Sequence, residues 1–201
     1  MDVKRLRERQ AEATRERLLA IARERFAAQG YAATSIEDIV QRAGVAKGAL
    51  YHHFSGKDAL FRGVYEAVLG DVVSAVMAAA NAEPEPWASV RAGLSAFLDA
   101  CLDPAFRRIV VLESVSVLPP DVREAEIGQV ELPMLRTVLT PLTSSEVLPG
   151  IAAEPLAHVA LGGLYGAALY IARSPHPNDA RQEVDAVLDA LIAGLRASAS
   201  R

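Results

Sequence analysis

The chain has 201 residues, of which 51% are hydrophobic and 5% aromatic, so it can bury a sizeable core and is not disordered throughout. Its one cysteine, Cys101, cannot form an internal disulfide, which excludes a disulfide scaffold and favours a reducing, cytoplasmic compartment. The net charge of −4 is divided unevenly: residues 1–57 hold eleven Lys or Arg against seven Asp or Glu, whereas residues 58–201 hold ten against eighteen. A basic head on an acidic body indicates that the head meets a polyanion.

The first part of the chain predicts three helices. Apolar side chains from Leu18 to Phe26 form one helical face, and Gly30 ends that helix. Thr34 or Ser35 caps a second, short helix, because an acidic residue follows three positions later as in a capping box. Gly44 then allows a sharp turn into a third helix at 46–53.

Residues 35–53 therefore have the pattern of a helix-turn-helix. The apolar residues of its two helices are expected to meet where the helices cross; they are Ile39, Val40, Ala43, Val45 and Leu50. This packing leaves a polar, aromatic and small set on the outward face of the second helix: Lys47, Gly48, Tyr51 and His52. Such groups suit an element that enters the major groove of DNA.

The stretch TRERLLAIARERFAAQGYAATSIEDIVQRAGVAKGALYHHFSGKDALF, residues 14–61, resembles the DNA-binding domain of the TetR/AcrR family of bacterial repressors. The features that carry the resemblance are Phe26 with Gly30-Tyr31, Thr34 to Ile36, Ala43 to Val45, Lys47 to Tyr51, Phe54, and Lys57 to Leu60. The resemblance implies DNA contacts from Lys47, Gly48, Tyr51, His52 and Lys57, and contacts to the DNA backbone from Thr34 and Ser35. It also implies that residues 1–55 bind DNA, while residues 56–201 bind a small-molecule ligand and dimerise.

Two of these features have plainer alternatives. Tyr51 is either a DNA contact or a core tyrosine whose hydroxyl is satisfied within the protein. The basic segment 4–9 is either a solvated charged face or an arm that reaches phosphates or the minor groove.

The rest of the chain predicts six more helices, so the expected fold is all-α with about nine helices. A capping-box pattern at Ser55 to Asp58 opens a long helix, which breaks at Asn81 to Pro86. The spacing of apolar residues and the positions of prolines predict the other helices at about 87–101, 104–118, 121–140, 155–173 and 178–197. The helix at 121–140 is expected to bend at Pro133, and residues 141–154 are expected to form a linker.

These helices offer apolar walls for a ligand pocket with few polar groups. We expect Trp87, Phe97, Phe106, Met134, Leu135 and Tyr165 to line it and to suit a mostly apolar small molecule. Glu113 lies in the apolar run 109–118 and needs a partner. That partner is Arg107, Arg108 or another helix, or else Glu113 is a pocket anchor for a cationic or hydrogen-bond-donating ligand. His158 poses the same choice between a satisfied interface histidine and a ligand contact.

The last two helices predict a homodimer. The helix at 155–173 is apolar nearly all round, and its glycines would let another helix approach closely. Pairing two copies about a two-fold axis would bury both helices through Leu161, Gly162, Gly166, Leu188, Leu191 and Leu195. The same axis would place two reading helices on one face, which implies a palindromic operator.

Other function classes have little support in the sequence. It has no Gly-rich phosphate loop, nucleophile elbow or HExxH motif, and its four histidines show no metal-ligand spacing, so we expect no enzyme, cofactor or metal. A helical adaptor that binds only protein would not need the basic reading helix.

The longest apolar run has 17 residues, short of the ~20 of a membrane span, so we expect no membrane partner. Cys101 on an apolar stripe is a buried hydrophobe or, alternatively, a redox sensor.

The interpretation that unites these features is a DNA-binding transcriptional regulator that responds to a small molecule. The resemblance implies repression rather than activation, with release from DNA when the ligand favours another spacing of the two reading helices.

Overall fold

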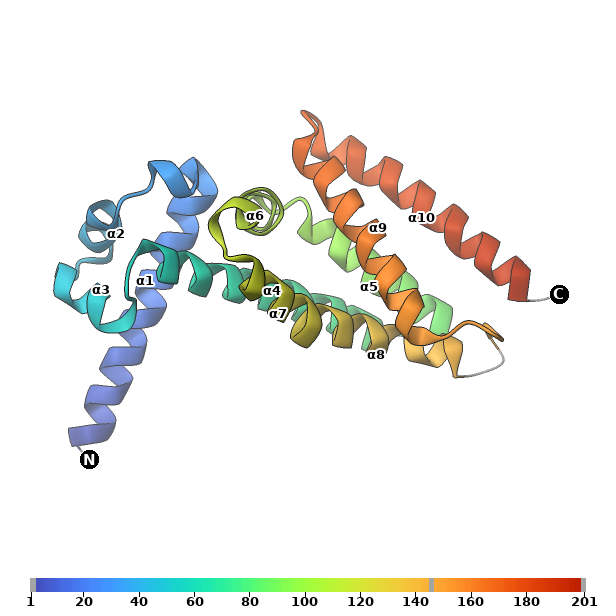
Figure 1. Cartoon of the computed structure of the whole chain (residues 1–201), viewed down its shortest axis with the longest axis horizontal. Coiled ribbons are helices and arrows are strands. Elements are labelled where there is room, and N and C mark those ends of the chain that lie inside the picture. The colour runs from blue at the N-terminus through green and yellow to red at the C-terminus, as the bar shows by residue number, and fades with distance from the viewer. Residues whose placement is uncertain (1–2, 145–146, 200–201) are drawn as a thin grey trace.

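The structure is a computed structural model that describes residues 3–144 and 147–199, and this part of the chain contains helices and no strand (Figure 1). The all-α expectation is confirmed. The elements are α1 (Val3–Ala33), α2 (Ile36–Ala43), α3 (Lys47–His53), α4 (Lys57–Asn81), α5 (Pro86–Ala100), η1 (Phe106–Glu113) continued by α6 (Ser114–Val117), α7 (Pro120–Glu126) continued by η2 (Ile127–Glu131) and α8 (Leu132–Thr143), α9 (Ala153–Arg173) and α10 (Pro177–Ala199). Counted as unbroken helical stretches, these elements are nine in the described ranges.

Helices α1, α2 and α3 pack around the start of α4 at one end of the molecule (Figure 1). Leu18 and Phe26 of α1, Ile39 of α2, Leu50 of α3 and Phe61 of α4 are all fully buried there. Val40 and Ala43 are also buried, and Val45 packs against this core, so the expected crossing of the two short helices is formed. Helix α4 then runs away from this end into the rest of the protein (Figure 1).

Gly30 interrupts α1 at the point where the sequence predicts its end. Its backbone has φ 83° and ψ 170°, a conformation that L side chains rarely adopt. A Cβ atom at this position would also collide with the carboxylate of Glu113 from η1. Glycine is therefore required both for the turn and for the close approach of η1.

Two stretches of the body are π-helical. One of them, η2, ends two residues before Pro133, whose missing N–H and bulky ring disfavour regular α-helical hydrogen bonding with the preceding turn. The sequence predicts a bend at this proline, and the structure accommodates it by widening the preceding turn. The other, η1, has no proline within it, and it packs against α1, α4 and α9.

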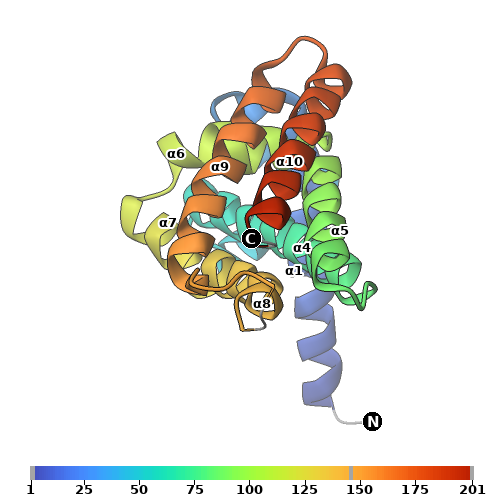
Figure 2. The ribbon, with the colours of Figure 1, turned by 90° about the vertical axis from the view of Figure 1, so that its right-hand side faces the viewer.

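Helices α5, α8, α9 and α10 enclose a second core at the other end (Figure 2). Helices α4 and α9 are both long and apolar enough to cross a membrane by length and composition alone. In α4, the apolar residues Phe61, Val64 and Val68 are buried among neighbouring helices, as in a core helix. Helix α9 leaves more of its surface uncovered, with Val159 and Tyr170 exposed.

Candidate nucleic-acid interface and ligand cavity

The helix-turn-helix is closed by local hydrogen bonds. The hydroxyl oxygen of Ser35 accepts from the backbone N–H of Asp38 at 3.1 Å and caps α2. Gly44 ends α2 in the left-handed conformation (φ 65°), and its N–H donates to the carbonyl of Gln41 at 3.2 Å. Because Leu50 faces inward, the opposite side of α3 is presented to solvent, with Lys47, Gly48, Tyr51 and His52 all exposed. Tyr51 is 48% exposed, so the alternative of a core tyrosine is excluded.

Within the described part of the chain, nothing requires residue 48 to be glycine. Its backbone is helical, and a Cβ atom built on it would meet none of the described atoms within 4 Å. A glycine in a helix costs free energy relative to alanine. An exposed glycine that nothing in the protein requires fits a helix whose backbone must approach another molecule closely.

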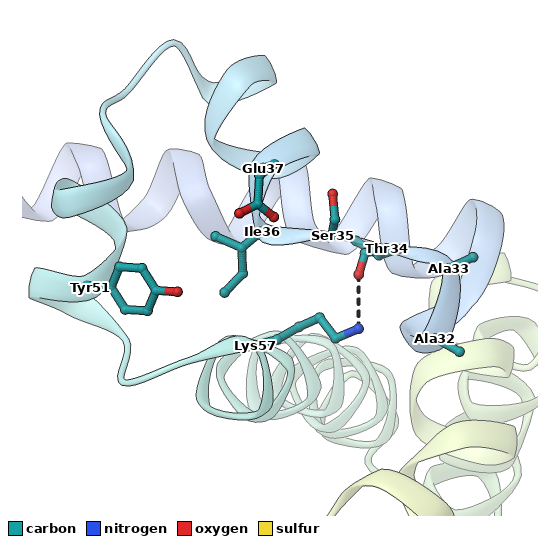
Figure 3. A pocket seen from close by; sticks show the side chains of 8 residues that line it. All are labelled: Ala32, Ala33, Thr34, Ser35, Ile36, Glu37, Tyr51 and Lys57. Carbon is teal, nitrogen blue, oxygen red and sulfur yellow. Dashed lines mark hydrogen bonds between the residues drawn. The ribbon is translucent and has the colours of Figure 1, made fainter.

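Thr34 and Lys57 form hydrogen bonds within the protein, to backbone carbonyls near the end of α1 (Figure 3). Thr34 is 2% exposed, and its hydroxyl donates to the carbonyl of Gly30 at 2.7 Å. The amino group of Lys57 donates to the carbonyls of Tyr31 and Thr34 at 2.9 and 3.0 Å, and it lies 4.1 Å from the centre of the Tyr31 ring. In the free protein the Thr34 hydroxyl is therefore unavailable to DNA, and the Lys57 ammonium is shared with two backbone carbonyls.

An open cleft of about 350 Å³ lies between α3 and the starts of α2 and α4 (Figure 3). Ser35, Glu37, Tyr51 and Lys57 contribute polar groups to its walls. Glu37 forms an ion pair with Lys47, and this partner lowers the pKa of the Glu37 carboxyl. A phosphate that approached Lys47 would compete with Glu37 for the same ammonium group.

The basic N-terminal segment is helical rather than extended. Residues 5–10 are exposed in α1, including Arg5, Arg7 and Arg9. This end of α1 projects beyond the other helices (Figures 1 and 2). Both interpretations of the segment, a solvated face and a DNA-binding arm, require such exposure.

A cavity of about 790 Å³ lies between α4, α5, α8, α9 and α10. Of the expected wall residues, Trp87, Phe97, Met134 and Leu135 line it. Its lining is apolar except at the exposed pair Tyr170 and Glu183, where the tyrosine hydroxyl donates to the carboxylate. Four residues expected at a dimer interface also border this cavity: Gly166, Leu188, Leu191 and Leu195.

A smaller chamber of about 50 Å³ lies next to this cavity, between α4, η1, η2 and α9. The expected wall residues Phe106 and Tyr165 line it, as does the half-buried Leu161. Glu131 also lines the chamber, although the sequence analysis did not single it out. The sequence feature that could have indicated a buried carboxylate here is the position of Glu131 directly before the apolar run Leu132 to Leu135.

Glu113 lines neither cavity, which favours the alternative of a partner within the protein over that of a ligand anchor. Its carboxylate accepts from the backbone N–H of Tyr31 at 2.8 Å. Arg108 donates to the carbonyls of Ala27 and Ala28 at 3.2 and 2.8 Å, and its Nε lies 3.7 Å from Glu113 Oε1. The alternative partner Arg108 is thus found, and the two residues form a clasp between η1 and the end of α1.

The π-helical form of η1 explains this clasp. In a π-helix the backbone hydrogen bond joins residues five apart, and these residues lie toward the same side of the helix, whereas in an α-helix they diverge around the axis. Arg108 and Glu113 are five residues apart, so the wide turn of η1 presents both toward α1.

His158 and Cys101, for which the sequence left open the roles of ligand contact and redox sensor, have ordinary surroundings. His158 is exposed, with Nε2 3.3 Å from a carboxylate oxygen of Glu154 one turn earlier, and it borders neither cavity. Cys101 is fully buried, and burial raises the pKa of its thiol to about 12. A buried thiol with that pKa stays protonated, which disfavours the redox alternative.

Comparisons with known proteins find family matches in two separate parts of the chain. Residues 18–64 match the family described as bacterial regulatory proteins, tetR family. Residues 87–195, more than half of the chain, match the tetracyclin repressor-like C-terminal domain. A crystal structure of a TetR-family transcriptional regulator from Pectobacterium atrosepticum is 30% identical, with a TM-score of 0.80 over 93% of this chain and 96% of that one.

Curated relatives match over shorter stretches. The transcriptional activator FasR of Mycolicibacterium smegmatis is 38% identical over 42% of this chain, and the regulator AcrR of Shigella flexneri is 40% identical over 28%. These matches cover only 39% and 26% of the relatives' own lengths. The FadR regulator of Bacillus subtilis, solved in complex with stearoyl-CoA, shares the fold with a TM-score of 0.71 at 19% identity, over 90% of this chain and 97% of that one.

Proposed function

The chain belongs to the TetR family of bacterial transcriptional regulators, and from that premise we propose that it is a repressor that binds a palindromic operator as a homodimer and is released by a small molecule. The observation that carries the proposal is the outward face of α3, where Tyr51 and Lys47 flank a glycine that the protein itself does not need. Such a face suits the major groove. Lys47, Gly48, Tyr51 and His52 would read bases, and Ser35 would contact the DNA backbone.

The dimer would form through α9 and α10. Val159 is 74% exposed, and Val187 and Leu191 are each 59% exposed, so a large apolar surface is uncovered in the single chain. Gly162, Gly163 and Gly166 on α9 would each accept a Cβ without contact to any residue that the structure describes. Leu161 is half-buried and lines the inner chamber, so only part of its side chain would be left for this interface.

Ligand binding would reach the DNA-binding domain through η1. Phe106, Val110 and Val111 of η1 line the inner chamber, while Arg108 and Glu113 of the same segment hold the end of α1. A ligand that displaced η1 would therefore strain this clasp. Because packed segments move as units, a small shift would change the angle between α1 and the body.

The walls of the main cavity suit an apolar ligand of considerable length. The FadR structure with stearoyl-CoA is a precedent for a long acyl chain in this fold. Relatives of the DNA-binding part include both an activator and a repressor. Repression is proposed because displacement of α1 by a ligand is a direct way to lose DNA binding.

A gel-shift titration with the DNA upstream of its own gene, against a shuffled duplex of equal length, tests the proposal. Wild-type protein should shift the upstream DNA at lower concentration, and Tyr51→Ala should weaken this specific binding more than the non-specific binding. Normal operator binding by Tyr51→Ala would show that α3 is not the reading helix. Sedimentation of the free protein at micromolar concentration should give a dimer, and a stable monomer would refute the palindromic arrangement.

A further inference from the structure

We propose that Glu131 and Tyr165 form a head-group subsite that binds the ammonium group of an otherwise apolar ligand. The inference rests on the proposed function, since it names the ligand class of the same regulatory cavity. A carboxylate and a phenol hydroxyl at the inner end of an apolar cavity would select a protonated amine over an alcohol or a carboxylic acid of the same length.

The carboxylate is buried and poorly satisfied. Glu131 is 6% exposed, and the Tyr165 hydroxyl lies 2.8 Å from both of its oxygens. One hydroxyl supplies one proton, whereas a carboxylate has about four acceptor positions. Among the described residues, Tyr165 is the only side chain that hydrogen-bonds to this carboxylate. Most of its acceptor capacity is therefore left for a molecule that enters the chamber.

Among residues 3–144 and 147–199, no charged side chain neutralises this carboxylate by direct contact. Arg123 and Glu126 of α7 act on Glu131 only through space and with opposite signs, and Tyr65 of α4 is a further neighbour. Burial raises the pKa of the Glu131 carboxyl, because the charged form has lost its hydration. A buried charge is stabilised when a counter-ion pairs with it directly, and a ligand ammonium would be such a counter-ion.

The subsite is continuous with the larger cavity. Five residues line both spaces: Val76, Phe97, Met134, Leu135 and Leu164. Met134 has an unbranched, flexible side chain that adapts to irregular gaps. The chamber of about 50 Å³ is larger than the ~30 Å³ that one water occupies, so it has room for a small head group. The cavity of about 790 Å³ would hold the apolar tail.

The test uses three ligands that share one tail: decylammonium, decanol and decanoate. Trp87 is the single tryptophan of the chain and lines the larger cavity, so its fluorescence reports binding of the tail. Calorimetry with the full-length protein supplies the dissociation constants. We expect decylammonium to bind at least tenfold more tightly than decanol, and decanoate to bind most weakly because its charge repels Glu131.

Two variants separate the subsite from the rest of the cavity. Glu131→Gln keeps the shape and an acceptor for Tyr165, and it should reduce the affinity for decylammonium about tenfold while leaving decanol binding unchanged. Glu126→Gln is the matched control, because it removes a carboxylate from the adjacent α7, outside the linings of both spaces, and should leave the preference intact.

The outcomes distinguish this proposal from the function on which it rests. Equal affinities for the three ligands in the wild type, or an unchanged preference in Glu131→Gln, would overturn the head-group subsite and leave the cavity as a general apolar site. Absence of binding by all three, with normal operator binding in the gel shift, would overturn both the subsite and the ligand role of the cavity.

Discussion

Replacing Gly48 by alanine should make the protein more stable and its DNA binding weaker. Gly48 is exposed in α3, its backbone is helical, and an added Cβ would meet no atom of the described residues within 4 Å. Alanine is favoured over glycine by about 0.5–1 kcal/mol in a helix. Because Gly48 lies in the first turn, we expect the lower end, a gain of about 0.5 kcal/mol in the free energy of unfolding.

The same methyl group would stand between the α3 backbone and the DNA. Forcing an extra methyl into a close-packed contact typically costs about 1–3 kcal/mol. We therefore expect operator affinity to fall by about tenfold or more, since tenfold corresponds to about 1.4 kcal/mol. Urea denaturation measures the stability, and gel-shift titration at one fixed salt concentration measures the affinity.

Gly70→Ala is the matched control. Gly70 lies in the middle of α4, is exposed, and also has nothing within 4 Å of an added Cβ. It should gain about 1 kcal/mol in stability without any change in DNA binding. If Gly48→Ala binds the operator as the wild type does, the glycine is not reserved for a close approach to DNA, and α3 does not come near the DNA at this position.

Three further predictions address the rest of the molecule. Glu113→Ala should lower the free energy of unfolding, measured by urea denaturation, by about 1–2 kcal/mol, because it removes a charged acceptor from the Tyr31 N–H. An unchanged free energy of unfolding would show that the clasp adds no stability. Val187→Glu combined with Leu191→Glu should convert the dimer to a monomer that no longer binds the operator. The monomer should stay folded, since both side chains are exposed in the single chain. If the double variant sediments as a dimer, the interface lies elsewhere. Burial raises the pKa of Glu131 above its unfolded value, so its contribution to stability is present at low pH and is lost as pH rises through the folded-state pKa. The melting temperature of Glu131→Gln should therefore exceed that of the wild type by more at about pH 8 than at about pH 4.5, and an equal difference at both would contradict a raised pKa.

The helices and the reading face follow from local patterns, and the sequence was sufficient to predict them. The Ser35 cap, the Gly44 turn and the apolar spacing of α2 and α3 all act within a few residues of each other. Such short-range preferences decide which side of a short helix turns inward, so Leu50 is buried and Tyr51 exposed as expected. The family resemblance of residues 14–61 depends on the same local features.

The partners of single polar residues depend on contacts distant in the chain. Glu113 meets Tyr31, which is 82 positions earlier, because η1 packs against the end of α1 and Gly30 leaves room for its carboxylate. Thr34 and Lys57 carry polar groups that suit DNA, yet both hydrogen-bond to the backbone at the end of α1. Glu131 is buried in a chamber formed by α4, η1 and α9, where Tyr165 of α9 donates to its carboxylate.

The stripe of α10 shows the same division. Its apolar residues from Val184 to Leu195 predict a buried face, but a stripe that wide meets two different surroundings. Val184 and Leu188 pack toward the core and the cavity, whereas Val187 and Leu191 stay exposed beside the cavity. Helical periodicity reports only that a side is apolar. The packing of α5, α8 and α9 against it decides which residues line a cavity and which are left for a partner, because those helices cover only one edge of the stripe.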